Sequence, residues 1–235
     1  MDLKSNWNGN FLVVDDFLKE KDKNYTLDFI RNFDYSEFQN KLGLFPIQVC
    51  LDPRIPENIR NYFQKISESY MPTLMKYLEE LAPKKCHLYD YCKFKIIISP
   101  PGFKEKNHID NFSKLLSAII YLSPENNYGT FFHESIDDEK PKEITWKVNR
   151  CLITANKYNK TWHSYRSHVD QYRYVVLITL HTRKIYSHMF VDLKFLDFLL
   201  FSAKRLIKYD LNNKIRETLG KIKKFLFNIP KVING

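Results

Sequence analysis

Short apolar runs separated by turn residues recur along the first 180 residues, and this pattern constrains the fold more than any other. The runs are rich in β-branched and aromatic residues and are bounded by Pro, Gly, Asn and Ser. They predict strands at residues 11–14, 89–98, 116–122, 129–132, 144–148, 151–154 and 172–180. Many short strands at such spacing are typical of a sandwich or barrel. The sequence therefore predicts a mainly β protein with a jelly-roll core and helices packed outside it.

Two stretches ahead of the main strands have helical spacing instead. Residues 25–33 predict a short helix, and from Glu57 to Leu81 apolar residues recur at intervals of three and four. Pro56 suits the first turn of this long amphipathic helix. Pro72 lacks an N–H and is expected to kink or interrupt it.

The last 45 residues differ in composition from the rest. Residues 191–235 hold ten Lys and Arg against four Asp and Glu, which is most of the net charge of +10. Apolar positions there predict two basic amphipathic helices, which either dock on the barrel or lie on an anionic membrane surface. We therefore expect a domain at 1–190 and a helical tail at 191–235. No nucleic-acid partner is expected, because no recognition motif accompanies the charge.

Length and composition favour a folded cytoplasmic protein. With 235 residues, 44% of them hydrophobic, the chain can bury a substantial core. No apolar stretch reaches the roughly 18 residues of a membrane span, and the first residues lack a signal-peptide core. We expect a cytoplasmic location, with the tail as the candidate for peripheral contact with the inner membrane surface. Cys50, Cys86, Cys92 and Cys151 lack CxxC spacing, which favours reduced thiols.

A His-x-Asp pair follows the first long apolar strand. In an extended strand, His108 and Asp110 point to the same side, about 7 Å apart. An imidazole and a carboxylate on one face form half of a metal site. A second histidine from another strand would complete the facial triad typical of non-haem Fe(II) oxygenases. We expect His163, which follows the strand at 151–154 after a polar turn, to supply it.

Ten residues past His163, Arg173 begins the last buried strand. A buried guanidinium needs an anionic partner, because leaving it unpaired costs several kcal/mol. A dicarboxylate cosubstrate would supply that partner. The sequence thus places a candidate anion site beside a candidate metal site.

Other residues compete for these roles. His133 is a rival third ligand, but it follows the first pair closely for a jelly roll. His168 lies in a polar loop, which is more often solvated, and His181 ends the last strand, where it can line the mouth of a pocket. Arg166 competes with Arg173, although a loop arginine usually faces solvent.

The combined pattern resembles the 2-oxoglutarate/Fe(II)-dependent dioxygenase superfamily, and its prolyl-hydroxylase-like members in particular. Residues 101–122 look like the strand pair around the first two ligands, 128–130 like the following Gly-rich strand, and 149–153 with 162–164 like the approach to the distal ligand. Residues 11–18 are similar to the opening strand, so the resemblance covers about residues 11 to 181. The family's double glycine is reduced here to Gly129. Residues 135–142 match nothing that is diagnostic of a substrate.

The resemblance implies a double-stranded β-helix and a set of cofactors. Fe(II) would be bound by His108, Asp110 and His163, with 2-oxoglutarate and O2 as cosubstrates and Arg173 on the far carboxylate of 2-oxoglutarate. Further pocket groups would be Tyr121, Thr179 and Tyr91. The implied reaction hydroxylates a substrate C–H bond and releases succinate and CO2. The presence of Asp110 favours hydroxylation, since halogenases of the family lack this carboxylate.

The substrate itself is not evident from the sequence. A small molecule, a glycan or a lipid-linked substrate is as reasonable as a protein side chain. The alternative function is a non-catalytic jelly-roll binding protein anchored through its basic tail. A zinc hydrolase is disfavoured, because no general-base carboxylate stands at a recognisable spacing from the three ligands.

Overall fold

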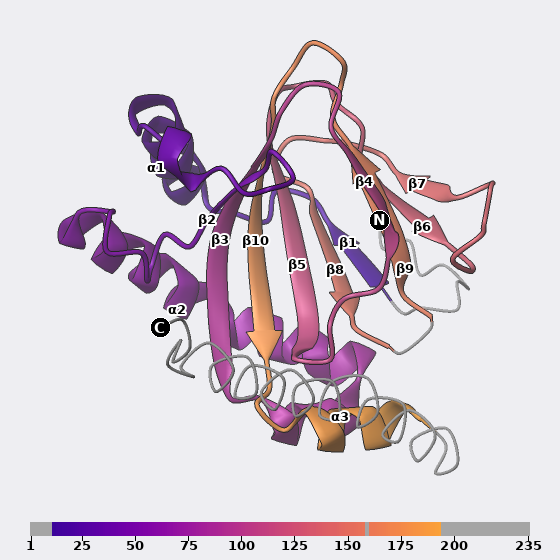
Figure 1. The fold of residues 1–235 in the computed structure, drawn as a ribbon. Coiled ribbons are helices and arrows are strands. Elements are labelled where there is room, and N and C mark those ends of the chain that lie inside the picture. Colours follow the sequence, from indigo (N-terminus) through magenta and orange to yellow (C-terminus); the bar gives the residue numbers. More distant parts are fainter. Residues whose placement is uncertain (1–10, 158–159, 194–235) are drawn as a thin grey trace, which may run out of the picture. The chain divides into compact units, whose positions relative to one another are not determined.

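The structure is a computed structural model, and it describes residues 11–157 and 160–193 (Figure 1). The strands are β1 (Phe11–Val14), β2 (Phe45–Ile47), β3 (Tyr91–Ser99), β4 (Lys104–His108), β5 (Lys114–Ser123), β6 (Thr130–His133), β7 (Lys142–Ile144), β8 (Cys151–Ala155), β9 (Trp162–Arg166) and β10 (Arg173–His181). The helices are α1 (Glu20–Asn32), α2 (Glu57–Leu81) and α3 (Ile185–Asp192), with the 3-10 turns η1 (Ser36–Phe38) and η2 (Pro83–Leu88).

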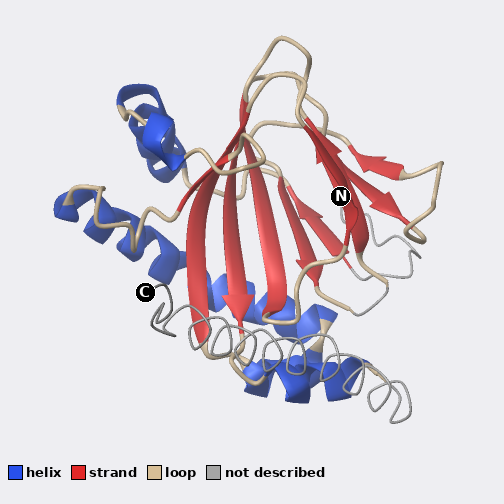
Figure 2. Cartoon of the chain, viewed as in Figure 1, coloured by secondary structure: helices blue, strands red, loops and turns tan. Residues whose placement is uncertain are grey.

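The strands form two antiparallel sheets that match the predicted jelly-roll architecture. The larger has the order β1-β8-β5-β10-β3-β2 and the smaller the order β4-β9-β6-β7. Figure 2 shows the two sheets, and most neighbouring strands within them are not consecutive in the sequence. This topology brings β4 and β9 together at one edge of the smaller sheet, although more than 50 residues separate them in the chain.

The larger sheet has helices on one face and the smaller sheet on the other (Figure 1). Because side chains alternate along a strand, each strand of the larger sheet points one set of side chains toward the helices and the other set toward the smaller sheet. Leu116, Ala118 and Ile120 of β5 belong to the main core, which also contains Phe63 and Leu74 of α2. The alternate residues of β5 face the smaller sheet and line the interior between the sheets. The larger sheet therefore contributes side chains to this interior from the second, more polar set.

Most predicted elements are confirmed, with shifted bounds. The strands at 11–14, 116–122, 151–154 and 172–180 and the helix from Glu57 to Leu81 are present, whereas the first helix begins five residues earlier than predicted. The long helix is not interrupted at Pro72. This proline is exposed, and Tyr70 and Leu74 anchor the helix in the core on either side of it. All four cysteines are free, as predicted.

The strand predicted at 144–148 is wrong, because β7 ends at Ile144. Beyond it, Trp146 turns inward, stacks on Tyr121 with ring centroids 4.6 Å apart, and donates from Nε1 to the carbonyl of Pro124. This burial of a large ring outweighs strand pairing. The same turn passes close to Gly129, where a Cβ atom would lie 1.7 Å from the carbonyl oxygen of Ile144. That contact explains a glycine at this position.

The tail was predicted at 191–235. Its residues 194–235 lie outside the described residues, so the expectations about them stay predictions. Val191 and Asp192 belong to α3, where Asp192 forms a buried ion pair with Lys85 of η2. Among the described residues, no helix is long and apolar enough to cross a membrane.

Candidate metal and cosubstrate site

Three predicted metal ligands meet where β4 and β9 pair. His108 ends β4 directly opposite His163 of β9, and their ring centroids lie 4.5 Å apart. Asp110 lies two residues past the end of β4, in the loop that leads into β5. The potential ligand atoms of all three residues lie within 4.8 Å of one another. The expectation that Asp110 shares a strand with His108 is wrong, since the loop, rather than strand alternation, brings its carboxylate to the histidines.

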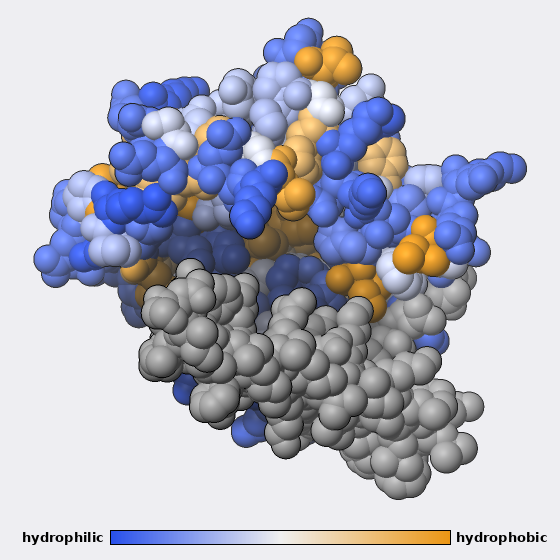
Figure 3. Space-filling model, viewed as in Figure 1, coloured by the Kyte–Doolittle hydropathy of each residue, from blue (hydrophilic) through white to orange (hydrophobic). Residues whose placement is uncertain are grey.

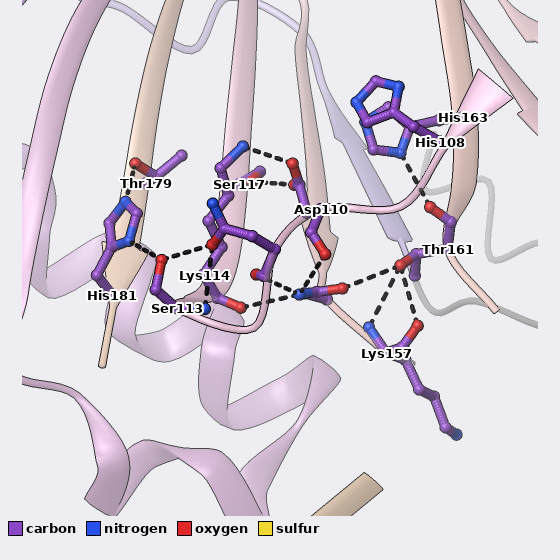
Figure 4. Close-up of polar contacts among 12 residues, drawn as sticks. His108, Asp110, Ser113, Lys114, Ser117, Lys157, Thr161, His163, Thr179 and His181 are labelled. Carbon is purple, nitrogen blue, oxygen red and sulfur yellow. Dashed lines mark hydrogen bonds and ion pairs between the residues drawn. The ribbon is translucent and has the colours of Figure 1, made fainter. Parts of the chain in front are cut away.

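Hydrogen bonds to backbone carbonyls fix the orientation of both imidazoles, and Figure 4 shows the one that His163 makes. Nδ1 of His108 donates to the carbonyl of Lys106 over 2.8 Å, and Nδ1 of His163 donates to the carbonyl of Thr161 over 2.9 Å. A carbonyl only accepts, so each Nδ1 carries the proton and each Nε2 keeps a free lone pair. Such second-shell bonds hold metal-binding histidines in the ligating tautomer. Both rings are therefore set to bind a metal through Nε2.

The carboxylate of Asp110 is held by two neighbours on β5. Its Oδ1 forms an ion pair with Nζ of Lys114, and its Oδ2 accepts from the hydroxyl of Ser117 over 2.8 Å. Burial raises the pKa of Asp110, but the charges of Lys114 and His163 and these hydrogen bonds lower it to about 2. Asp110 is therefore anionic at any physiological pH, as a metal ligand must be.

The environment of His163 favours its neutral form. Burial lowers the pKa of His163, which the Asp110 carboxylate opposes and the neighbouring His108 reinforces. A neutral imidazole with a free Nε2 is the form that binds metal. Two imidazole nitrogens and one carboxylate oxygen on one side of a cavity are the donor set of a 2-His-1-carboxylate facial triad. The residues present fit an Fe(II) ion.

Arg173 lies in the same cavity without an acidic partner among the described residues. Only 2% of the residue is exposed, and its Nε makes a long hydrogen bond of 3.4 Å to the carbonyl of Tyr128. Its Nη2 is buried with no hydrogen-bond partner. The guanidinium carbon lies 4.7 to 5.5 Å from the ring centroids of Tyr165, Trp146 and Tyr121. Burial lowers the pKa of Arg173, yet an arginine stays charged in proteins. This unpaired cation is suited to an anionic ligand.

The cavity that joins these groups has a volume of about 250 Å³. The three metal ligands are on one side, and Arg173 is at the start of β10. Apolar residues fill the wall between them: Leu44, Ile97, Ile119, Val175 and Leu177. Polar side chains of Glu105, Lys114, Ser117, Thr130 and Tyr165 complete the lining. A cavity of this size, with a cation and a candidate metal site in its wall, fits a small dicarboxylate that reaches from one to the other.

The other predicted pocket groups lie next to this cavity and do not line it. Tyr121 is fully buried, faces Arg173 and donates from its hydroxyl to Oγ1 of Thr130 over 2.9 Å. Thr179 bonds to Nε2 of His181 over 2.7 Å, and the ring of His181 stacks on Tyr91 with centroids 5.0 Å apart. The ring of Tyr121 thus lies against the guanidinium of Arg173. Thr179 belongs to a chain of hydrogen bonds that runs through His181 and Ser113 to the loop after Asp110 (Figure 4).

The rival residues all have other partners. Nε2 of His133 bonds to Oγ of Ser164 over 2.8 Å, and Nδ1 of His168 pairs with Asp170. Arg166 lies over the ring of Tyr128, with its guanidinium carbon 4.0 Å from the centroid. None of these residues lines the cavity that holds the triad.

Sequence reasoning missed the residues that support the triad. Asn156 follows β8, and its Nδ2 donates to the carbonyls of Asp110, Asn111 and Lys114 over 3.4, 2.9 and 3.2 Å. Its Oδ1 accepts from the hydroxyl of Thr161, whose carbonyl holds His163. An asparagine after a strand carries no signal of this role in a single sequence. The ion pair between Lys114 and Asp110 could have been predicted, because Lys114 lies four residues past Asp110 at the start of a strand.

Comparison with known proteins supports the fold. No family model matches the sequence, and no curated protein matches it. A prolyl hydroxylase from Trichoplax adhaerens, solved with a peptide fragment of the hypoxia inducible factor oxygen degradation domain, is 18% identical. It aligns over 77% of this chain and 86% of its own with a TM-score of 0.56. A Pseudomonas putida prolyl-4-hydroxylase is 13% identical and aligns over 74% and 94%, with a TM-score of 0.52. The chain has the fold of these structures.

Proposed function

From this fold and the geometry of the triad, we propose that the protein is an Fe(II)- and 2-oxoglutarate-dependent oxygenase. The observation that carries the proposal is the cavity that combines two fixed imidazoles, a carboxylate and a buried, unpaired guanidinium. An iron site alone needs only the first three groups. The fourth is explained by a cosubstrate with a second carboxylate.

Each residue has a defined part in this proposal. His108 and His163 would bind Fe(II) through Nε2, and Asp110 through the carboxylate that Ser117 and Lys114 orient. Arg173 would bind the far carboxylate of 2-oxoglutarate through its free Nη2. Bound iron would supply the activation of O2 that couples the decarboxylation of 2-oxoglutarate to succinate and CO2 with the oxidation of a substrate C–H bond. Apolar side chains form part of the wall between these groups.

The reaction we propose is hydroxylation of a small molecule, a glycan or a lipid-linked substrate, at a cytoplasmic location. Peripheral membrane contact through residues 191–235 stays part of the proposal. A tail deletion that tests it should begin after Leu193, because Asp192 pairs with the buried Lys85. Loss of activity on liposome-presented substrate, with activity on soluble substrate intact, would support this contact. Unchanged activity on both would exclude it.

The non-catalytic alternative is not favoured. A jelly-roll binding protein gains nothing from burying an arginine without a partner beside three metal ligands, because such a cation destabilises the fold.

The proposal is tested by turnover of 2-oxoglutarate. Many oxygenases of this kind convert the cosubstrate slowly without a prime substrate, so succinate should form when Fe(II), 2-oxoglutarate and O2 are all present. His108→Ala should abolish succinate formation. The matched control is His87→Ala, an exposed histidine of η2, which should leave it unchanged. Succinate formation that persists in His108→Ala would contradict the proposed metal site.

A further inference from the structure

Three lysines lie beside the triad on the inner face of the larger sheet. In β3, Lys93 is opposite Thr179 of β10 and Lys95 is opposite Leu177, so both share a face with Ile97, which lines the cavity. Lys114, at the start of β5, also lines the cavity. The residues that alternate with Lys93 and Lys95 belong to the core under α2 or border it. We call Lys93, Lys95 and Lys114 the lysine face.

The three side chains are close enough to repel one another. Burial lowers the pKa of Lys95, and the charges of Lys93 and Lys114 lower it further. All three lysines also act, together with burial, to lower the pKa of His181 to about 4, which keeps this neighbour neutral. Like charges gathered on a concave face destabilise the protein unless a counter-charge joins them.

The described residues supply little of that counter-charge. Lys114 pairs with Asp110, which is itself a proposed metal ligand. No carboxylate among residues 11–157 and 160–193 forms an ion pair with Lys93 or Lys95, and Nζ of Lys93 lies 5.6 Å from the centroid of the Tyr91 ring. Glu105 is on the opposite sheet, where it lines the cavity. Within the described part of the chain, the ammonium groups of Lys93 and Lys95 therefore have no acidic partner, and the lysine face is a cationic surface.

The position of this surface differs from that of an ordinary solvated lysine patch. All three lysines are partly buried, whereas Lys65 and Lys76 on α2 are exposed. Figure 3 shows that this side of the molecule is hollowed over β3, β10 and β5, with hydrophilic atoms beside an apolar floor. Lys114 lines the cavity of the triad, whereas Lys93 and Lys95 continue the face of Ile97 along β3, and Lys93 also lines a second cavity beside α2. Given about 4.8 Å between strands, β3 and β5 lie about 10 Å apart, which suits a molecule of sugar or nucleoside size.

We propose that the lysine face binds the phosphate group of a phosphorylated small molecule, which is the substrate oxidised at the triad. This inference rests on the proposed function and names its substrate class. Lysine ammonium groups act as compact point charges and suit a tetrahedral dianion, whereas planar carboxylates are more often bound by the fork of an arginine. Arg173 serves the cosubstrate inside the cavity, and the lysine face, of which Lys114 alone lines this cavity, serves the substrate, so the two anions bind at different places.

The test uses three sugars that differ in one group. Binding of glucose 6-phosphate, glucuronate and glucose to the full-length protein is measured by calorimetry, with and without Fe(II) and 2-oxoglutarate under anaerobic conditions. Glucose 6-phosphate should bind at least tenfold more tightly than glucose. Lys93→Gln/Lys95→Gln should weaken its binding at least tenfold. Lys65→Gln/Lys76→Gln, which removes the same charge from α2, should leave it unchanged.

The outcomes separate this inference from the proposed function. If 2-oxoglutarate binds with iron but glucose 6-phosphate binds equally well to both double variants, or to none, the inference is wrong and the oxygenase proposal stands. If glucuronate binds as tightly as the phosphate, the assignment to phosphate is overturned in favour of a carboxylate, as on an acidic peptide. If the phosphate depends on the lysines but 2-oxoglutarate does not bind, the proposed function fails, and the substrate role of the lysine face fails with it.

Discussion

His108 and His163 lie opposite each other on β4 and β9, and each donates from Nδ1 to the carbonyl two residues earlier in its own strand segment. The same local hydrogen bond, from Nδ1 to the carbonyl two residues earlier, thus occurs in both facing segments and leaves both Nε2 atoms free. Two imidazoles held at this separation in one tautomer are preorganised for the metal ion that we propose.

Removal of the buried guanidinium should affect the cosubstrate and spare the metal. Arg173→Ala should weaken 2-oxoglutarate binding by about 10- to 100-fold, because charge-assisted bonds to the far carboxylate are lost, and should change Fe(II) affinity little. Arg166→Ala is the control, since Arg166 lies outside the cavity over Tyr128. Calorimetry with 2-oxoglutarate measures both. Equal effects in the two variants would mean that Arg173 does not bind the cosubstrate.

Asn156 should act on the metal site without touching it. Asn156→Asp keeps the size but removes the amide donor to the carbonyls of Asp110, Asn111 and Lys114, so we expect metal affinity to fall by about 10- to 100-fold. Asn149 provides the control: its buried amide bonds to Leu18, away from the triad. Asn149→Asp should lower the melting temperature and leave metal affinity intact. If Asn156→Asp lowers the melting temperature but leaves metal affinity unchanged, Asn156 stabilises the fold and does not position the metal ligands.

Stability of the metal-free protein should decrease in mild acid, in part through His181. Burial, followed by the charges of Lys93, Lys114 and Lys95, lowers the pKa of His181 to about 4, below the unfolded value of 6.5. Between these values the unfolded chain binds the proton and the folded chain does not, so the free energy of unfolding falls as the pH falls from 6.5 to 4. The loss from this group is on the order of 3 kcal/mol at most.

Urea unfolding at pH 7 and pH 4.5 measures this dependence. His181→Gln should be less sensitive to the change in pH than the unchanged protein, and His87→Gln, at an exposed position, should match the unchanged protein. If the free energy of unfolding of His181→Gln falls between pH 7 and pH 4.5 as much as that of the unchanged protein, the acid sensitivity arises from other groups.

The two glycines around the site should respond differently to an added methyl group. At Gly129 a Cβ would meet the backbone of Ile144 at 1.7 Å, so Gly129→Ala should lower the free energy of unfolding by about 3 kcal/mol or more. At Gly102 there is space, but φ is +69°, and Gly102→Ala should lower the free energy of unfolding by about 1 kcal/mol. Denaturant unfolding of the two variants measures both changes. A larger loss of stability in Gly102→Ala than in Gly129→Ala would contradict the close passage of β7 against Gly129.

The sequence predicted the parts of this protein that follow from periodicity and spacing. Alternation and turn residues located β1, β5, β8 and β10. Apolar residues at intervals of three and four after Pro56 located α2. The residues His108, Asp110, His163 and Arg173 were named from their types and order, and the structure places all four around one cavity. Their roles stay a proposal.

What the sequence could not predict depends on tertiary contacts. Strand β9 is polar and short, with no apolar alternation, so only its pairing with β4 and β6 defines it. Trp146 turns inward because it stacks on Tyr121. Asn156 can hold the triad only because its amide reaches the carbonyls of the loop after Asp110. Thr179 was expected in the cosubstrate pocket, but its hydroxyl bonds to His181 on its own strand. Such choices depend on neighbours that are distant in sequence.

The most direct test of the central claim is an anaerobic titration of metal-free protein with Fe(II) and then 2-oxoglutarate. The bidentate chelate of a 2-oxo acid on Fe(II) gives a weak visible charge-transfer band. We predict that the band appears in the unchanged protein, is lost in His108→Ala, and requires a much higher concentration of 2-oxoglutarate in Arg173→Ala. The absence of a band in protein that is folded and binds Fe(II) would contradict the account.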